Sequence, residues 1–250
     1  MAVYGHVKHI AAEVGPAPAG RYRMLHNDEF ARTSAVSPAW KNLCHLGNIV
    51  RYPKNSVVFR AGDTVDALYY VLKGEVRMES LHMDGAEKTY WYIGEGCVFG
   101  ETPLFHRIPS RLTVVFLCPG EVCVFSRKVL LGQIFAQYPE ITEDMFRNMA
   151  CKIRVLTNQI ATLSMDGLAV RICKYLQLHL SRDETGKLIS RPRINQQGLA
   201  NLLGVHRVTC NRVLRNLERG GIISEFCRET VYILDEEAFQ RRLEGFSEDG

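Results

Sequence analysis

An apolar repeat with a period of seven residues divides the chain into two unlike parts. From Thr142 to Leu163, the repeat residues stand three or four positions apart. A period of 3.5 residues is typical of a helix whose narrow apolar stripe packs along a partner helix. We therefore predict a long dimerisation helix over residues 137–166, and a homodimer. The residues assigned to its interface are Phe146, Met149, Ile153, Leu156, Ile160 and Leu163.

An amphipathic helix packed only on its own domain is the alternative, but it usually carries a broader apolar face. Here polar residues leave only a narrow stripe and favour the dimer, namely Lys152, Arg154, Asn158 and Gln159. Asp166 and Gly167 then break the helix, so a hinge is expected at this point.

Short segments rich in Val, Tyr, Phe and Thr precede the long helix, and glycines stand in the breaks between them. Many short strands with regular turn signals are typical of an antiparallel sandwich or barrel. We predict such a domain over residues 41–136, after an N-terminal arm at 1–40 that contains a linker-like segment, Val14–Gly20. The predicted strands are Val57–Arg60, Ala67–Lys73, Glu75–Leu81, Lys88–Ile93, Leu112–Leu117 and Glu121–Ser126.

The composition is that of an ordinary soluble globular chain, with 46% hydrophobic and 23% charged residues among 250. No apolar run approaches the roughly 18–20 residues that cross a bilayer, and Met1–Gly20 lacks the apolar core of a secretory signal. A cytosolic protein without membrane contact is therefore expected. The eight cysteines form no Cys-x-x-Cys pair, so we expect mostly buried thiols and no metal site.

Residues 195–219 carry the pattern of two short helices joined by a glycine turn. Asn195 is a good N-cap for the first helix, Gly204 supplies the turn, and His206 opens the second helix. The core face of the second helix is read as Val208, Val213, Leu214 and Leu217, and its polar face as Arg207, Thr209, Asn211 and Arg212. This pattern predicts a helix-turn-helix whose second helix fits the major groove of DNA. An ordinary helical hairpin is the alternative.

The C-terminal part of the chain is also basic. Between Arg171 and Arg219 there are ten basic and three acidic residues, a local charge of +7, which favours a polyanion partner. Alternating residues at 222–226 and 230–234 suggest a two-stranded wing after the second helix. We assign residues 167–240 to a DNA-binding domain and 241–250 to a tail. The residues predicted to contact DNA are Gln196, His206, Arg207, Val208, Thr209, Asn211 and Arg212.

A family resemblance is carried by three stretches of the chain, which are Ala61–Met78, Gly94–Thr113 and Gly204–Ile223. They are similar to the β-roll strands, the ligand-binding cassette and the recognition helix of the cyclic-AMP receptor protein/FNR (Crp/Fnr) family of bacterial transcription regulators. The resemblance implies an α+β fold, with an N-terminal antiparallel β-roll, a long dimerisation helix and a C-terminal winged helix-turn-helix. It also implies a palindromic DNA site, RNA polymerase as a partner, and an effector that changes the dimer geometry.

Departures from the cyclic-nucleotide branch bear on the effector. The chain keeps Gly100, Glu101 and Arg111, but Leu112 replaces the serine that binds the cyclic phosphate in that branch. A Leu156-Thr157 pair stands where the branch has the purine-contacting Thr-Ser of the long helix. A leucine in place of a hydroxyl donor makes a poorer anion site. Cyclic AMP is therefore a disfavoured alternative.

Metal-containing branches of the family set other requirements. The iron–sulfur branch uses a cysteine cluster in the N-terminal arm, and residues 1–43 contain no cysteine, so no such cluster is expected. A haem-based gas sensor is a second alternative, since the histidine or cysteine ligand that haem needs has several candidates. These are His106, Cys97, His6, His9 and His26. Lone histidines are more often ordinary surface or core residues.

Regulators of halorespiration, which sense chlorinated phenols, show the nearest likeness. They share a Val-Thr pair in the recognition helix, an aromatic strand in the pocket and a lysine on the dimer helix, and Val208-Thr209, Tyr90–Tyr92 and Lys152 match these here. This favours a small aromatic anion, stacked on Trp91 and paired by Lys152 or Arg111. The predicted effector residues are Trp91, Gly100, Glu101, Arg111, Leu112, Lys152, Leu156 and Thr157.

Two readings of Val208 follow from the resemblance. Other branches carry a base-reading glutamate at this place, whereas valine can only touch a thymine methyl group, so half-sites rich in A·T are expected. Alternatively, Val208 packs inside the helix pair. Enzymes form the rival class, but the chain has no G-x-x-x-x-G-K, H-E-x-x-H or G-x-S-x-G motif, so no enzyme is predicted. An interaction module that binds cyclic nucleotides without DNA is disfavoured by the basic second helix.

Overall fold

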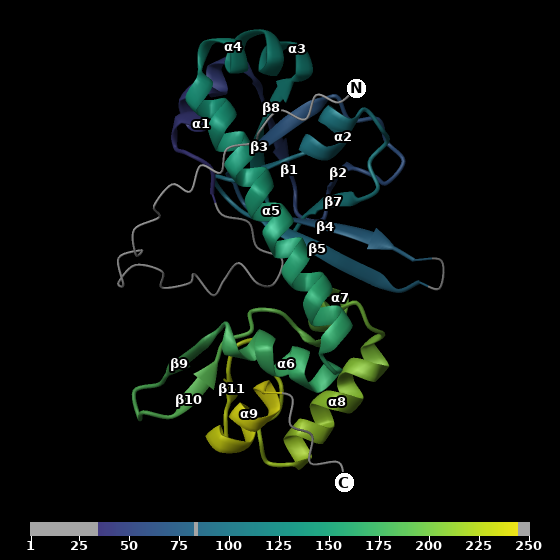
Figure 1. Ribbon diagram of the computed structural model, residues 1–250, viewed down its shortest axis with the longest axis vertical. Helices are drawn as coiled ribbons and strands as arrows, with labels where there is room; N and C mark the ends of the chain where they lie inside the picture. Colours follow the sequence, from purple (N-terminus) through teal and green to yellow (C-terminus); the bar gives the residue numbers. More distant parts are fainter. Residues whose placement is uncertain (1–34, 83–84, 245–250) are drawn as a thin grey trace, which may run out of the picture.

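The computed structural model describes residues 35–82 and 85–244 and has two lobes joined by one long helix (Figure 1). The N-terminal lobe is a β-roll, and the C-terminal lobe is mainly helical. The long helix α5 (Pro139–Met165) begins on the β-roll and ends at the second lobe. This arrangement confirms the predicted α+β fold class.

Two four-stranded antiparallel sheets form the β-roll. One has the order β1 (Asn48–Tyr52), β8 (Gly120–Ser126), β3 (Ala67–Lys73), β6 (Val98–Phe99). The other has the order β2 (Val57–Phe59), β7 (Thr113–Phe116), β4 (Val76–Leu81), β5 (Glu87–Ile93). Apolar side chains from both sheets fill the interior, among them Val71, Val76, Ile93, Phe99, Phe116 and Val122.

The six predicted strands are confirmed within one or two residues at their ends, but β1 and β6 were not predicted. β1 lies at the edge of its sheet and exposes Asn48, Ile49 and Arg51. Its sequence therefore lacks the clear alternation of a half-buried strand. β6 has only two residues, which is too short for any periodic signal.

Short helical segments lie at the end of the β-roll around the start of α5. They are α1 (Ala39–Asn42), the 3₁₀ turn at Leu43–Leu46, α2 (Glu101–His106), α3 (Arg127–Val129), the π turn at Leu130–Ile134, and α4 (Phe135–Gln137). Trp40 of α1 is fully buried, and its indole N–H donates to Asp144 Oδ2 of α5 at 2.8 Å. Val36 and Trp40 thus belong to the β-roll core, although they fall within the segment predicted as an arm.

α5 has apolar side chains on two faces. Ile141, Met145 and Val155 are buried against the β-roll. The stripe predicted as a dimer interface lies elsewhere on the helix, and its Phe146, Ile153, Ile160 and Leu163 are 46–67% exposed. Met149 and Leu156 of the same stripe are half-buried. In the single chain, therefore, most of the stripe is not covered by any of the described residues.

The C-terminal lobe surrounds a second core. It contains α6 (Leu168–Gln177), β9 (Leu180–Arg182), β10 (Leu188–Ser190), α7 (Gln196–Leu203), α8 (Arg207–Arg219), β11 (Val231–Tyr232) and α9 (Glu236–Leu243). Buried side chains from every helix meet there, among them Leu176, Leu199, Leu214 and Phe239. Asp166 and Gly167 separate α5 from α6, as predicted, and Lys174 Nζ lies 2.7 Å from Asp166 Oδ2.

Two segments of this lobe differ from the prediction. No strand was predicted within residues 182–193, yet they contain β10, which pairs with β9 and β11 in a three-stranded sheet. Of the predicted wing, only Val231–Tyr232 forms a strand, while residues 222–226 contribute a single bridge, Ile223 to Ile233. The strands are three residues or fewer and are flanked by charged side chains, so they carry little periodic signal. Among the described residues, no helix is both long and apolar enough to cross a bilayer.

Candidate functional site

The helix pair α7–α8 has the geometry of a helix-turn-helix. Asn195 caps α7, because its side-chain oxygen accepts from the Gly198 N–H at 2.8 Å. Gly204 ends α7 in the left-handed conformation, with φ at +66°, which L residues with a side chain rarely adopt. Only Gly204, Val205 and His206 separate the two helices, so α8 is held at a fixed angle to α7.

One face of α8 is packed and the other is open. Cys210, Leu214 and Leu217 are buried in the C-terminal core, whereas Arg207, Arg212 and Arg215 are exposed. Val208 is 81% exposed, so the reading that placed it on the core face was wrong. The other residues predicted to contact DNA lie along or next to this face: His206 is exposed, and Gln196, Thr209 and Asn211 are half-buried.

Residues from the segment after α8 extend this surface. Arg207 and Gln196 border a shallow cavity of about 280 Å³, together with Phe226, Cys227 and Arg228. Arg228 therefore lies beside the start of the recognition helix, although it was not predicted as a contact. The sequence feature that could have indicated this contact is the position of Arg228, a basic residue in the turn of the expected wing.

The β-roll holds a cavity of about 270 Å³ between β4, β5, the start of α2 and α5, here named the β-roll cavity. Six of the eight predicted effector residues line it: Trp91, Gly100, Glu101, Arg111, Leu112 and Lys152. The structure adds apolar and hydroxyl side chains that were not predicted, among them Phe59, Met78, Tyr90, Ile108 and Ser110. The predicted residues thus come together from three separate parts of the chain.

Neighbouring Tyr90 and Trp91 both line the β-roll cavity, although strict alternation would place them on opposite faces of β5. The register between β4 and β5 explains this, because Met78 pairs with Trp91 and Glu79 pairs with Thr89. Tyr90 is therefore the extra residue of a β-bulge, which redirects side chains locally. Trp91 was predicted to face the cavity, and the bulge adds Tyr90.

A buried ion pair forms one wall of the β-roll cavity. Lys152 Nζ of α5 lies 2.8 Å from Glu101 Oε1 and donates to the Val98 carbonyl at 2.9 Å. The two side chains are only 8% and 11% exposed. The other carboxylate oxygen, Glu101 Oε2, is buried with no hydrogen-bond partner among the described residues. Lys152 is thus already neutralised, and an acceptor oxygen remains for a ligand that donates a hydrogen bond.

Gly100 allows the chain to approach closely at this wall. Its φ is +91°, and a Cβ placed there would stand 2.9 Å from the Ala67 carbonyl and 3.0 Å from the Tyr69 ring. Only glycine fits without displacing backbone. Next to it, Arg111 is exposed at the rim of the cavity. Ser110 is buried, and its hydroxyl donates to the Leu112 carbonyl at 2.7 Å.

The remaining predicted effector residues lie outside the β-roll cavity. Thr157 is exposed, and its hydroxyl donates to the Ile153 carbonyl at 3.0 Å. Leu156 borders a different cavity. Of the candidate haem ligands, Cys97 and His106 are not among the residues that line the β-roll cavity. His6, His9 and His26 lie outside the described residues.

Four of the eight cysteines are buried, rather than most of them as predicted; they are Cys97, Cys123, Cys173 and Cys210. Burial raises the pKa of Cys123 and Cys173 to about 12, and that of Cys210 to about 11. Thiols that stay protonated are poor nucleophiles and metal ligands. Within residues 35–82 and 85–244, no group of three or more His, Cys, Asp or Glu side chains is arranged to hold a metal ion.

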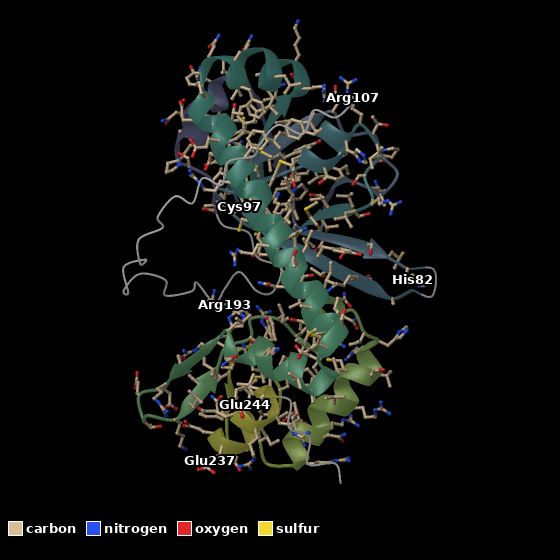
Figure 2. All side chains as sticks on the ribbon, in the orientation of Figure 1. His82, Cys97, Arg107, Arg193, Glu237 and Glu244 are labelled. Atoms are coloured by element: carbon tan, nitrogen blue, oxygen red, sulfur yellow. The ribbon has the colours of Figure 1, made fainter. Side chains whose placement is uncertain are left out.

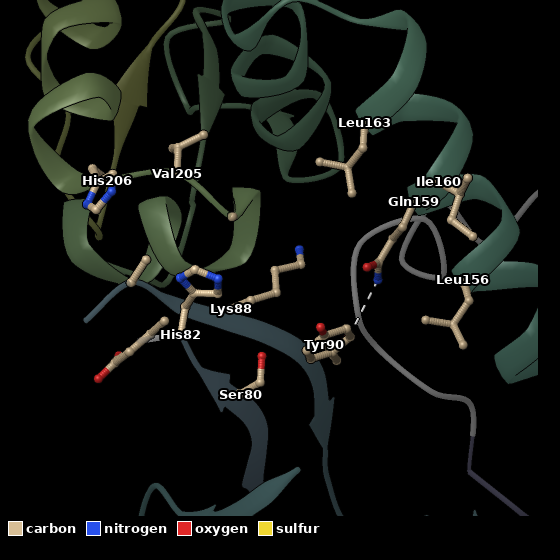
Figure 3. A pocket seen from close by; sticks show the side chains of 13 residues that line it. Ser80, His82, Lys88, Tyr90, Leu156, Gln159, Ile160, Leu163, Val205 and His206 are labelled. Carbon is tan, nitrogen blue, oxygen red and sulfur yellow. Dashed lines mark hydrogen bonds between the residues drawn. The ribbon is translucent and has the colours of Figure 1, made fainter. Parts of the chain in front are cut away.

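A larger cavity of about 580 Å³ lies where the two lobes meet, and we name it the junction cavity (Figure 3). It is bordered by Lys88 and Tyr90 of β5, by Leu156, Gln159, Ile160 and Leu163 of α5, and by Gly204, Val205 and His206 of the helix-turn-helix. Gln159 Nε2 donates to the Tyr90 carbonyl across it, at 3.5 Å. Tyr90 therefore borders both cavities.

Comparison with known proteins agrees with both lobes. Residues 49–137 match the cyclic nucleotide-binding domain, and residues 170–242 match the Crp-like helix-turn-helix domain. A cyclic AMP receptor protein of Thermus thermophilus is 30% identical over 172 residues, which are 69% of this chain and 77% of that protein. The chain belongs to the Crp/Fnr family. It is accordingly a DNA-binding transcription regulator with a cyclic nucleotide-binding domain.

Further relatives and solved structures show how wide the likeness is. A CRP-like cAMP-activated global transcriptional regulator of Mycobacterium tuberculosis is 29% identical over 197 residues, 77% of this chain and 87% of that protein. The c-di-GMP-responsive regulator CLP of Xanthomonas campestris superposes with a TM-score of 0.67 at 26% identity, over 78% of this chain and 98% of CLP. CprK complexed with OCPA shares the fold, with a TM-score of 0.70 at 21% identity, over 85% and 96% of the two chains.

Proposed function

We propose that this Crp/Fnr regulator acts as a homodimer whose affinity for one DNA sequence is set by a small ligand in the β-roll cavity. The observation that carries the proposal is the open face of α8, where Arg207, Val208 and Arg212 are exposed beside a glycine turn. A polar helix face of this kind fits the major groove.

The dimer part rests on α5. Its exposed stripe contains Phe146, Ile153, Ile160 and Leu163 at heptad spacing, and large apolar side chains gathered on a surface usually mark an interface. Two chains paired along this stripe are related by a two-fold axis, so their DNA site is an inverted repeat with half-sites one helical turn apart, about 34 Å.

Base recognition rests on Val208 and its neighbours. Valine has no hydrogen-bonding group, but its exposed methyl groups can contact a thymine methyl group in the major groove. We expect an A·T pair at that position of each half-site. Arg207 and Arg212 then either read a guanine or bind phosphate. Contact with RNA polymerase stays a prediction from the family.

For the effector we propose a small aromatic acid. Ligand cavities usually measure about 300–1,000 Å³, and a cavity of about 270 Å³ suits a ligand much smaller than haem. Tyr90 and Trp91 offer ring faces, and Arg111 at the rim offers the cation. Because Lys152 already pairs with Glu101, Arg111 is the better partner for the acid group.

Cyclic AMP remains the second candidate, because Gly100, Glu101 and Arg111 are retained and Glu101 Oε2 has an open acceptor position. The loss of a serine hydroxyl at Leu112 disfavours it. With cyclic AMP as the effector, the protein would bind DNA by the same mechanism, so the two candidate functions differ only in the ligand.

Selection of bound sites from a random duplex pool tests the DNA-binding proposal. We expect an inverted repeat with A·T-rich half-sites, and no enriched sequence would refute sequence-specific binding. The effector is then tested by thermal shift with a panel of small aromatic acids, cyclic AMP and haem. Stabilisation by an aromatic acid that is lost in Arg111→Leu supports the proposed class, whereas a response only to cyclic AMP or haem overturns it.

A further inference from the structure

The β4–β5 hairpin reaches beyond the β-roll and touches the helix-turn-helix of the same chain. Figure 2 shows His82 at the outer end of this hairpin, above the C-terminal lobe. Glu87 and Lys88, at the start of β5, lie against α7 and the glycine turn that follows it. This contact joins the two lobes at a second place, separate from the covalent hinge at Asp166–Gly167.

Lys88 makes the first part of the contact. Its ammonium group donates to the Leu202 carbonyl, near the C-terminal end of α7. Its methylene groups pass beside the turn, so that a Cβ added to Gly204 would stand 3.2 Å from Lys88 Cδ. Arg171 of α6 donates to the adjacent Leu203 carbonyl at 2.9 Å. Two cations thus satisfy the final carbonyls of α7, where the helix dipole favours positive charge.

Asn201 makes the second part. Its side chain is almost fully buried, at 3% exposure, and its Nδ2 donates to Glu87 Oε2 at 2.5 Å. Its Oδ1 accepts from Gln197 Nε2 at 2.7 Å. The amide therefore uses both of its ends, one within α7 and one across the lobes. A buried amide satisfied in this way favours one position of its partner, because a buried donor left unpaired loses the hydrogen bonds that it would make with water.

The same strand continues into the β-roll cavity. Tyr90 and Trp91 line that cavity and stand only two or three residues after Lys88. At roughly 3.3 Å per residue, the cavity wall and the α7 contact are separated by about 10 Å of one strand. Tyr90 also borders the junction cavity. A few residues of one strand therefore link the wall of the β-roll cavity to the residues that contact α7.

We propose that Glu87 and Lys88 form a clasp, which holds α7 and so couples the β-roll cavity to the orientation of the recognition helix within one chain. The proposal rests on the DNA-binding function above. With the clasp closed, Arg207, Val208 and Arg212 remain exposed, so the clasp does not cover the DNA-reading face. The clasp holds that face in one orientation. When the clasp opens, the helix-turn-helix regains rotational freedom, which DNA binding must then remove.

Lys88→Met tests the clasp, since it keeps the side-chain stem and removes the ammonium group. The matched control is Lys54→Met, which changes an exposed lysine in the β1–β2 turn. For the selected DNA site we expect the Kd of Lys88→Met to rise at least fivefold with an unchanged salt slope. We also expect faster hydrogen exchange in α7. An unchanged or tighter Kd overturns the clasp, and a salt slope lowered by about one unit would instead make Lys88 a phosphate contact.

A donor–acceptor exchange gives an independent test. Asn201→Asp places two carboxylates against each other and should open the clasp, with the same loss of affinity. Adding Glu87→Gln supplies an amide donor to the new carboxylate and should restore the Kd to within about twofold of wild type. Failure of this rescue in a folded double variant contradicts the proposal. If wild-type protein selects no DNA site, the proposed function fails, while hydrogen exchange in α7 still decides whether the clasp exists.

Discussion

The buried ion pair between Lys152 and Glu101 carries the first prediction at the residue scale. Both side chains are about nine-tenths buried, and they link α5 to the start of α2. Lys152→Met removes the cation and leaves a buried carboxylate without its partner. Breaking a buried pair from one side costs about 3–5 kcal/mol, so we expect a marked loss of β-roll stability.

Urea unfolding followed by tryptophan fluorescence measures this loss, because both tryptophans, Trp40 and Trp91, lie in the β-roll. Combining Lys152→Met with Glu101→Gln removes both charges and should recover most of the stability. A single variant as stable as wild type would show that the ion pair does not stabilise the β-roll.

Val208 gives the second residue-scale prediction. Val208→Glu places a carboxylate on a position that is 81% exposed, where it can accept from a cytosine amino group. We expect the preferred pair at that position of the site to change from A·T to G·C, with a discrimination of about 1–3 kcal/mol. Site selection with the variant and wild type side by side measures the change. A G·C pair already fixed there in the wild-type selection contradicts the role given to Val208.

Residue identities in the sites were predictable wherever a local motif carried them. The glycine turn at Gly204 and the polar face of α8 follow from spacing alone. The partner of Lys152 could not be predicted in this way, because Glu101 lies 51 positions away and only the fold brings the two together. The sequence likewise could not place Tyr90 in the cavity wall, since a β-bulge depends on the register of two strands.

At the scale of elements, α5 carries the prediction for assembly. Ile160 is 64% exposed in the single chain and lies at the centre of the C-terminal half of the stripe. Ile160→Glu puts a charge into the proposed interface, where it would be buried without a partner. We expect the dissociation constant of the dimer to rise at least tenfold.

Light scattering over a concentration series measures the monomer–dimer equilibrium. Ala161→Glu is the matched control, because Ala161 is exposed on α5 but stands outside the stripe. If Ile160→Glu stays dimeric at the concentrations where wild type does, the interface lies on another surface.

Long and strongly periodic elements were the predictable ones. The heptad spacing gives the extent of α5 to within about two residues at each end, since one helix face repeats over many turns. The strands β9, β10 and β11 have only two or three residues each. β9 and β10 pair across a short turn, where three-residue strands carry little signal. β11 pairs with β10 from about 40 residues away, as Val231 does with Ser190, and local pattern cannot supply such a contact.

At the scale of the whole molecule, we expect Lys88 to make the free energy of unfolding depend on pH. Burial, with a further contribution from Arg171, lowers the pKa of Lys88 from 10.5 to about 8. Between these values the unfolded chain holds a proton that the folded protein has released, so the free energy of unfolding rises with pH. Other titratable groups around the junction cavity are His82, Glu87, Tyr90 and His206.

The difference in Tm between wild type and Lys88→Met isolates this effect, because methionine does not titrate. We expect that difference to shift in favour of wild type as the pH is raised from 7.5 to 9.5. The same comparison with Lys54→Met gives the baseline. A constant difference across this range would mean that Lys88 keeps its charge in the folded protein.

The contact between the lobes was beyond sequence analysis. The two lobes were each recognisable, and the hinge at Asp166–Gly167 was predicted. However, Glu87 and Asn201 are 114 residues apart, and the helix-turn-helix pattern that contains Asn201 does not indicate a partner for its side chain. Their pairing follows from the length of α5 and the reach of the hairpin, which are properties of the assembled fold.

The packing of Lys88 beside Gly204 also bears on engineering and on evolution. Regulators of this kind invite chimeras, in which the sensor of one protein is fused to the DNA reader of another at the end of the long helix. Here such a fusion would separate Glu87 and Lys88 from the α7 surface that fits them. A functional hybrid should therefore carry the hairpin together with the DNA reader, and natural changes at positions 87, 88, 201 and 204 should occur jointly rather than singly.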